Sequence, residues 1–263
     1  MASPYVVWAI AFVIIPLLMV FYYGFTNNDG AFTLENIIAI FDPRHLKALG
    51  IAMLLSVIST IICILLAYPL ALILANKKGS QDKIIIMIFI LPMWMNFLLR
   101  ILAWQTLLEK SGVINTLIEN FNSLPLFDLP TLNIINTPYA IILGMVYNFL
   151  PFMILPLYNV LSKIDPNVIN AAKDLGANSI HTFIRIILPL SVPGIISGVT
   201  MVFVPALTTF AISAMLGGSK ISLIGNIIEQ EFSTASNWHL GSGLSVVLMI
   251  FIIINMIVTS IFD

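Results

Sequence analysis

A polar stretch between two long apolar runs holds the residues best suited to recognising a partner. Asp165 followed by Pro166 is typical of a helix start, because the carboxylate can accept backbone N–H groups and proline suits the first helical position. Small residues follow at Ala171 and Ala172, and Gly176 is placed to end the helix. The spacing predicts a short helix with a close-approach face, a glycine turn and a second helix. A soluble protein could grip such an element, although an ordinary amphipathic linker helix has the same pattern.

The sequence lacks the patterns that would support chemistry of its own. It has no phosphate-binding G-x-x-x-x-G-K-[S/T] loop, no cluster of metal-ligating residues and no supported Ser-His-Asp arrangement. The histidines His45, His181 and His239 fall in loops, where solvated side chains are expected. Cys63 is the single cysteine, so no internal disulfide can form. Since the formal charge is only −1, no basic surface points to nucleic acid. We predict a protein that is not an enzyme and binds no metal or other cofactor.

The composition indicates a membrane protein. Of 263 residues, 60% are hydrophobic and 9% charged, whereas a soluble domain is about half apolar and a quarter charged. A spanning helix needs about 20 mostly apolar residues. The first apolar run is also longer than the 7–15 residues typical of a signal peptide. We therefore predict a single all-α, polytopic transmembrane domain over 1–263 with six spans, at about 4–26, 48–75, 84–108, 138–161, 187–217 and 244–262. The fifth is overlong and contains three prolines, so an interruption is expected.

The charges of the connecting loops predict the orientation. Loops 76–83 and 162–186 together carry six basic and three acidic residues. Loops 27–47, 109–137 and 218–243 carry four basic and eight acidic residues, including Glu229 and Glu231. The positive-inside rule places the first pair of loops, and with them both termini, in the cytoplasm. An acidic outer mouth would attract cations, although acidic residues also simply tolerate an outer face.

The pattern around Gly176 resembles the permeases of bacterial ABC importers. Their cytoplasmic loop reads E-A-A, three residues, G, nine residues, I, one residue, L-P, and the match here is Ala171, Ala172, Gly176, Ile186, Leu188 and Pro189. Asn170 stands where the family has glutamate, which puts the energetic role of that position in doubt. The resemblance implies that the loop at about 162–186 docks on an ATPase, through Asn170, Ala171, Ala172, Asp174, Leu175, Gly176 and Ala177.

Within that family the chain is most similar, along its whole length, to the B-type permeases of spermidine/putrescine importers. Stretches such as 91–100, 147–153 and 216–226 carry this likeness, while permeases for sulfate, molybdate, iron or thiamine share the architecture. The resemblance implies a type I importer permease (MetI-like) fold in the bacterial cell membrane. It also implies four kinds of partner: the lipid bilayer, a second and different C-type permease, two cytoplasmic ATPases and an external polyamine-binding protein. ATP and Mg would act on the ATPase and not on this chain.

Residues inside the spans suggest a route for a cation. Arg100 is the one charged side chain well inside a span; because it would repel a polyamine, a structural or gating role is expected. Aromatic rings attract ammonium groups, and the candidate pathway residues are Trp94, Asn96, Trp104, Tyr147, Asn148, Thr209 and Ser213. Interface anchoring is the alternative for the aromatic residues. Related polyamine permeases often carry an acidic residue where this chain has Ala214.

Two other classes of membrane protein fit the sequence less well. A secondary transporter or channel working alone usually needs ionisable residues in the membrane, and Arg100 is the only one available. A non-transporting scaffold would leave the pattern at 170–189 unexplained.

Overall fold

The computed structural model describes residues 3–76, 87–122 and 130–260, which are almost entirely helical. The chain forms two compact units. The first comprises Met1–Ala52 and Ser222–Ile257, and the second comprises Met53–Ile221 and Val258–Asp263. Within the described ranges, extended pairing is limited to one isolated bridge between Thr26 and Phe32. The prediction of an all-α fold is confirmed.

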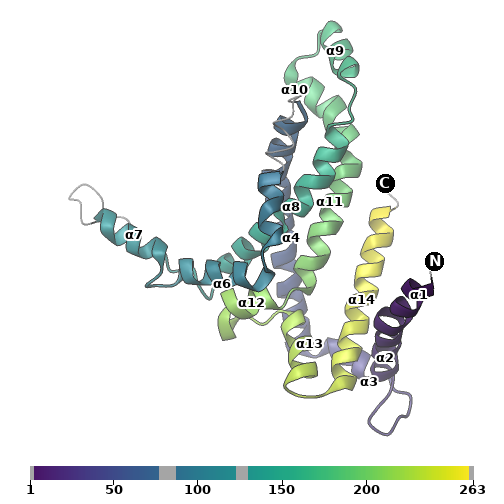
Figure 1. The fold of residues 1–263 in the computed structure, drawn as a ribbon. Coiled ribbons are helices and arrows are strands. Elements are labelled where there is room, and N and C mark those ends of the chain that lie inside the picture. Colours follow the sequence, from purple (N-terminus) through teal and green to yellow (C-terminus); the bar gives the residue numbers. More distant parts are fainter. Residues whose placement is uncertain (1–2, 77–86, 123–129, 261–263) are drawn as a thin grey trace. The chain divides into compact units, whose positions relative to one another are not determined.

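The first unit is built from helices at both ends of the sequence (Figure 1). Asn36 holds the N-terminal segment in shape, because its side-chain amide donates to the carbonyl oxygen of Thr26 at 2.9 Å. Gly243 packs directly on Asn36, and a Cβ there would come within 2.6 Å of it, so only glycine fits. The helices of the unit are α1 (Ser3–Ala9), the π-helix η1 (Ile10–Ile14), α2 (Ile15–Gly24), α3 (Glu35–Ile38), η2 (Ala39–Phe41), the start of α4 (Pro43–Asn76), α13 (Ile224–Ser233) and most of α14 (Trp238–Ser260).

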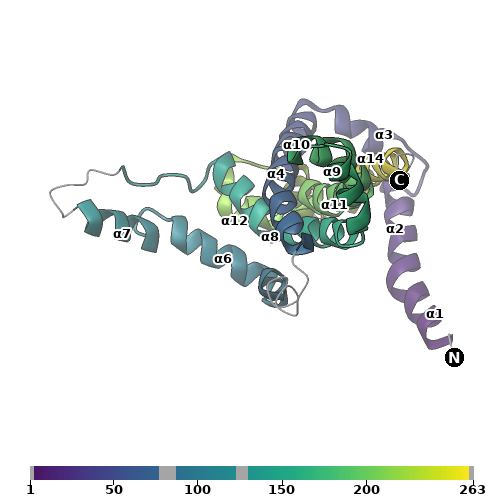
Figure 2. The same ribbon diagram turned by 90° about the horizontal axis from the view of Figure 1, so that it is seen from above.

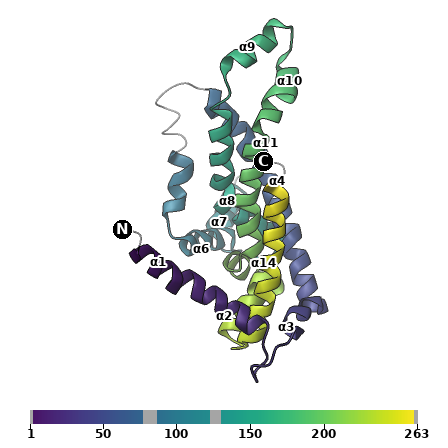
Figure 3. The same ribbon diagram turned by 90° about the vertical axis from the view of Figure 1, so that its right-hand side faces the viewer.

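The second unit contains the rest of α4 and the helices of the middle of the chain. These are η3 (Leu91–Trp94), α6 (Phe97–Leu108), α7 (Val113–Asn122), α8 (Pro138–Leu161), α9 (Pro166–Asp174), α10 (Ser179–Thr182), the π-helix η4 (Phe183–Ile187), α11 (Leu188–Thr208), α12 (Ala211–Leu216) and η5 (Gly218–Lys220). Figures 1 and 3 show α8 and α11 side by side, with α9 and α10 at one end of the pair. In Figure 2, α6 and α7 follow one another away from that pair.

Glycines bring α8 and α11 into close contact. A Cβ on Gly194 would lie 3.1 Å from the carbonyl oxygen of Pro156, and one on Gly198 would lie 2.5 Å from the sulfur of Met153. The two glycines are four residues apart, the small-residue spacing that lets membrane helices approach closely. The spacing is visible in the sequence, but no prediction above rests on it.

Among the residues that the structure describes, five helices are long and apolar enough to span a membrane, or six if one bent pair is a single span. Those five run over Pro4–Gly24, Pro43–Ala75, Pro138–Leu161, Ser179–Thr208 and Trp238–Thr259. The fourth predicted span, 138–161, coincides with α8. The predicted fifth span, 187–217, has different boundaries, because the helix begins at Ser179 and the backbone turns extended at Thr209 before α12.

The third predicted span, 84–108, is not one straight helix. Its residues 84–86 lie outside the described ranges, and the remainder bends by 99° between Trp94 and Phe97. Pro92 removes a backbone donor just before the bend. Asn96 then begins a new helix, since its side chain accepts hydrogen bonds from the backbone N–H groups of Leu98 and Leu99.

Candidate functional site

The loop between α8 and α11 has the helix–turn–helix form that its sequence predicts. The Asp165 carboxylate accepts a hydrogen bond from the backbone N–H of Asn167 at 2.9 Å, and Pro166 occupies the first turn of α9. At the other end Gly176 has a φ of 85°, a left-handed conformation that disfavours side chains. Its N–H bonds to the carbonyl of Lys173 at 2.9 Å, and the next N–H bonds to that of Ala172 at 3.0 Å. This pair of bonds is a Schellman cap, so the predicted glycine stop is confirmed.

Asn178 starts the second helix of the loop. Its side-chain oxygen accepts a hydrogen bond from the backbone N–H of His181 at 2.8 Å, and its carbonyl oxygen accepts one from the hydroxyl of Thr182 at 3.0 Å. Two capped helix ends therefore flank Gly176. The loop is held in a defined shape by its own residues.

The loop exposes two large apolar side chains, one outside the candidate spans and the other in the first turn of the span Ser179–Thr208. Leu175, directly before the glycine turn, is 90% exposed, and Ile180 is 68% exposed. Ala172 is buried, Ala177 is half-buried, and Asn170, Ala171, Asp174 and Gly176 are exposed. Exposed apolar side chains that lie together mark a contact with another protein or with the membrane. We refer to residues 162–186 as the docking loop.

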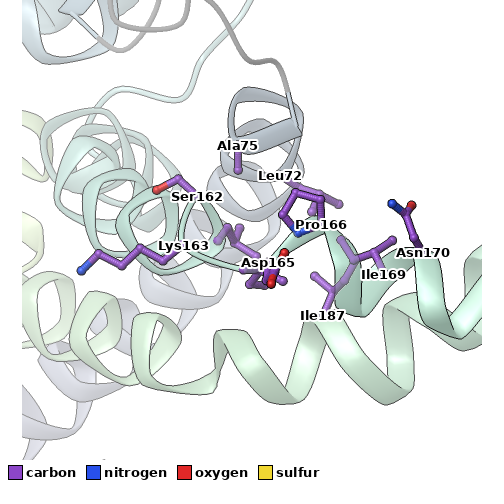
Figure 4. A pocket seen from close by; sticks show the side chains of 11 residues that line it. Leu72, Ala75, Ser162, Lys163, Asp165, Pro166, Ile169, Asn170 and Ile187 are labelled. Atoms are coloured by element: carbon purple, nitrogen blue, oxygen red, sulfur yellow. The ribbon is translucent and has the colours of Figure 1, made fainter.

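Two hollows border the docking loop. One, of about 340 Å³, is lined by Ala172, Leu175, Gly176, Ala177, His181, Arg185 and Ile186. The other, of about 390 Å³, lies between the end of α4 and α9 (Figure 4). Its wall combines Leu72 and Ala75 of α4 with Ile169 and Asn170 of α9. The docking helix α9 is therefore not packed tightly against the end of α4.

A second group of residues joins α6 to α8. Trp104 meets the ring of Tyr147 edge-on, with ring centroids 5.3 Å apart. Arg100 lies one helical turn before Trp104 and is only 8% exposed. Its Nε and Nη1 atoms have no hydrogen-bond partner in the described part of the chain, although its guanidinium carbon lies 5.8 Å from the centre of the Phe97 ring. We refer to Arg100, Trp104, Tyr147 and Asn148 as the α6–α8 cluster.

Comparison with known proteins identifies the family. The family described as "Binding-protein-dependent transport system inner membrane component" matches residues 67–263. This chain belongs to that family. It is therefore a multi-pass inner-membrane transport subunit and not an enzyme, as the loop pattern predicted.

Named relatives of this permease cover almost its whole length. The spermidine/putrescine transport system permease protein PotB of Haemophilus influenzae is 38% identical over 245 residues, which is 91% of this chain and 84% of the relative. That of Escherichia coli is 38% identical over 249 residues, covering 92% and 89%. The inner membrane ABC transporter permease protein YdcU of Escherichia coli is 31% identical, covering 84% and 72%. The likeness to B-type permeases stated from the sequence is confirmed.

Two solved structures share the fold of the permease. One is a bacterial ABC transporter that imports the acidic polysaccharide alginate, with a TM-score of 0.77 at 16% identity, covering 98% of this chain and 92% of that one. The other is an alginate transporter in complex with an alginate-bound periplasmic protein, with a TM-score of 0.79 at 14% identity, covering 98% and 91%. The predicted importer-permease fold is confirmed, and at this identity the likeness extends to the fold alone.

The predicted pathway residues of this permease fall into separate places. Asn148 is buried beside Tyr147, and its amide donates to the Gly144 carbonyl while its Oδ1 has no partner among the described residues. Thr209 and Ser213 are buried around the break between α11 and α12, and α12 packs on both α6 and α8. Trp94 and Asn96 instead lie at the bend before α6 and are exposed.

The two acidic residues assigned to the outer mouth lie on α13, in the first unit of the permease. Glu229 and Glu231 are both half-buried. Glu229 accepts a hydrogen bond from the hydroxyl of Ser233 at 2.9 Å. No group of three His, Cys, Asp or Glu side chains suited to a metal occurs in the ranges that the structure describes.

Proposed function

We propose that this chain is the B-type permease of an ATP-driven importer for spermidine and putrescine. The observation that carries the proposal is the 38% identity to curated spermidine/putrescine permeases over more than nine tenths of the chain. A relationship of that extent includes the docking loop, the spans and the connections between them. The named substrate of the relatives is the reason for proposing a polyamine cargo.

The proposed motor is a separate ATPase that grips the docking loop. Support comes from the bare Leu175 and Ile180 side chains and from the two capped helices that hold them in place. ATP and Mg then act on the ATPase, and this chain binds no cofactor. Asn170 is exposed at the rim of the larger hollow, so an amide in place of glutamate can still donate and accept hydrogen bonds there.

The proposed assembly contains this chain, a different C-type permease, two ATPases and an external polyamine-binding protein. The excess of basic residues in loops 76–83 and 162–186 supports a cytoplasmic position for the docking loop and both termini. The complex of an alginate transporter with its periplasmic protein supports the binding-protein partner. The proposed route for the cargo includes the aromatic pair Trp104 and Tyr147, because ammonium groups favour aromatic faces.

One observation favours a second candidate, an importer of a different small solute. The six predicted spans contain no deep Asp or Glu, and Ala214 stands where polyamine permeases often have an acid. A polyamine pathway would then take its counter-charge mainly from the partner permease or from Glu229 and Glu231.

Uptake by the reconstituted complex distinguishes the two candidates. Proteoliposomes containing this chain, the C-type permease and the ATPases are supplied with ATP inside. The binding protein and labelled spermidine, putrescine, sulfate or thiamine are added outside. The polyamine proposal predicts ATP-dependent uptake of spermidine or putrescine only. Accumulation of another solute with no polyamine uptake would overturn it.

A further inference from the structure

A buried chain of hydrogen bonds links α4 to the beginning of α11. The hydroxyl of Tyr68 lies 2.7 Å from Oγ of Ser191, and Ser191 Oγ donates to the carbonyl of Leu188 at 2.8 Å. Since a serine hydroxyl has one proton, that bond leaves Tyr68 as the donor to Ser191. Tyr68 is 8% exposed and Ser191 is fully buried, so water does not compete for these bonds. The bonds join residues that are 123 positions apart in sequence.

Tyr68 also contacts the end of the docking loop, where the π-helix η4 leads into α11. Its ring meets Phe183 edge-on, at 5.6 Å between centroids and an interplanar angle of 87°. Phe183 begins the π-helix η4, and Ser191 lies four residues after that helix ends. One tyrosine therefore holds both sides of η4.

The π-helix η4 interrupts the regular α-helical hydrogen bonding between α10 and α11. The backbone N–H of Leu188 bonds to the carbonyl of Phe183, five residues back, and Pro189 has no N–H to offer the preceding turn. Such wide turns are frequent at functional positions in helices. A displacement of the docking loop would be absorbed at η4 unless a neighbour constrained it.

Beyond Tyr68, a hollow separates the last turns of α4 from α9. Leu72 and Ala75 follow Tyr68 along one face of α4, at the helical spacing of four and then three residues. Both line the 390 Å³ hollow that separates α4 from α9. The last turns of α4 thus border open space, whereas Tyr68 is tied directly to η4 and α11.

We propose that Tyr68 is a positioning residue that couples the docking loop to α4. Through Ser191 and Phe183 it makes η4 and the start of α11 move together with α4 when a partner displaces α9. The inference rests on the proposed function, because it assigns to this contact the transmission of a displacement that the ATPase imposes. Without the hydroxyl bond, part of each ATP-driven displacement is lost as bending at η4.

The test measures coupling, as labelled spermidine imported per ATP hydrolysed in the same proteoliposomes of the complete complex. Tyr68→Phe keeps the ring against Phe183 and removes only the hydroxyl. Ser191→Ala removes its acceptor. A net hydrogen-bond contribution of ordinary size predicts a fall in this ratio of about two- to tenfold in either variant. Because both variants break the same contact, the ratio in the double variant falls no further than in the worse single one.

Tyr139→Phe, which removes an exposed hydroxyl on α8, is the matched control and keeps the wild-type ratio.

Each outcome has a defined meaning. An unchanged ratio in Tyr68→Phe overturns the inference while leaving the proposed function intact. Equal falls in Tyr68→Phe and Tyr139→Phe also overturn it, because the effect is then not specific to the contact. Wild-type vesicles that import spermidine without ATP overturn the proposed function, and the inference with it. Should Ser191→Ala fail to assemble because it strands the buried Tyr68 hydroxyl, the comparison of Tyr68→Phe with Tyr139→Phe still decides.

Discussion

The docking loop leaves large apolar side chains bare, whereas the α6–α8 cluster buries polar groups that lack partners. Leu175 is 90% exposed outside the spans, and Arg100 is 8% exposed with two guanidinium nitrogens unbonded in the described part of the chain. Each departs from the usual rule that apolar groups are inside and buried polar groups are paired. Such departures concentrate at sites that a protein uses. The exposed apolar side chains of the loop are suited to contact with a partner, whereas the unbonded guanidinium nitrogens of Arg100 are expected to lower the stability of the chain itself.

The largest expected effect comes from a charge at the bare surface of the docking loop. Leu175→Asp should weaken ATPase binding by about 30-fold or more, the size of an interface hot spot, without a folding cost, because the side chain touches little of its own chain. Co-purification at graded ATPase concentrations measures the loss. Phe32→Asp, at a 73% exposed apolar residue in the first unit, should leave binding unchanged. Equal ATPase binding by wild type and Leu175→Asp would show that Leu175, like the control residue Phe32, does not contact the ATPase.

A substitution in the α6–α8 cluster should make the permease more stable. Arg100→Met removes a buried cation with unbonded nitrogens and keeps an apolar side chain of similar length. We expect the free energy of unfolding of the isolated permease to rise by about 1–3 kcal/mol, as followed by thermal unfolding in detergent. Arg100→Lys keeps the charge and should bring no gain. A loss of stability in Arg100→Met would show that the guanidinium is paired and that its burial does not destabilise the permease.

The glycine turn should show a smaller, local effect. An added Cβ meets open space at both Gly176 and Gly50, but only Gly176 has a positive φ. Gly176→Ala should therefore cost about 1–2 kcal/mol, whereas Gly50→Ala in helix α4 should gain about 0.5–1 kcal/mol. Faster tryptic cleavage at Lys173 in Gly176→Ala alone would reveal the loosened end of α9. Equal cleavage of both variants would mean that the cap does not hold the loop.

The smallest effect is expected at the acidic residues of α13. Neutralising both, as Glu229→Gln with Glu231→Gln, should lower polyamine uptake about twofold at low salt, because long-range attraction weakens. Salt should erase the difference, since screening shortens the reach of the charges. Gln230→Glu, between them, should raise uptake under the same conditions. A defect that persists in high salt would instead indicate direct contact with the cargo.

Local sequence signals predicted the docking loop better than the α6–α8 cluster. Asp165, Pro166 and Gly176 each act on their own backbone, so their types and spacing define both ends of α9. The bend at residues 95–96 was not foreseen, because the apolar run conceals that Asn96 caps a new helix. The contact of Tyr68 with Ser191 was also missed. It joins distant residues, and neither residue differs in its local sequence from an ordinary span position.

The pathway residues show the same limit. Trp94, Asn96, Trp104 and Tyr147 were chosen for the chemistry of their side chains. The structure brings only Trp104 and Tyr147 together, because the bend before α6 exposes the other two. Residue type predicts what a side chain can bind, whereas its neighbours depend on how the helices pack.

The central claim is that the docking loop meets a separate ATPase on the cytoplasmic side. The single native cysteine, Cys63, is buried, so Leu175→Cys provides an accessible thiol at the loop and Phe32→Cys provides one in loop 27–47. Thiol cross-linking in the assembled complex should join the ATPase to residue 175 and not to residue 32. In intact cells, a membrane-impermeant thiol reagent should label residue 32 and spare residue 175. A cross-link from residue 32, or external labelling of residue 175, would contradict the account.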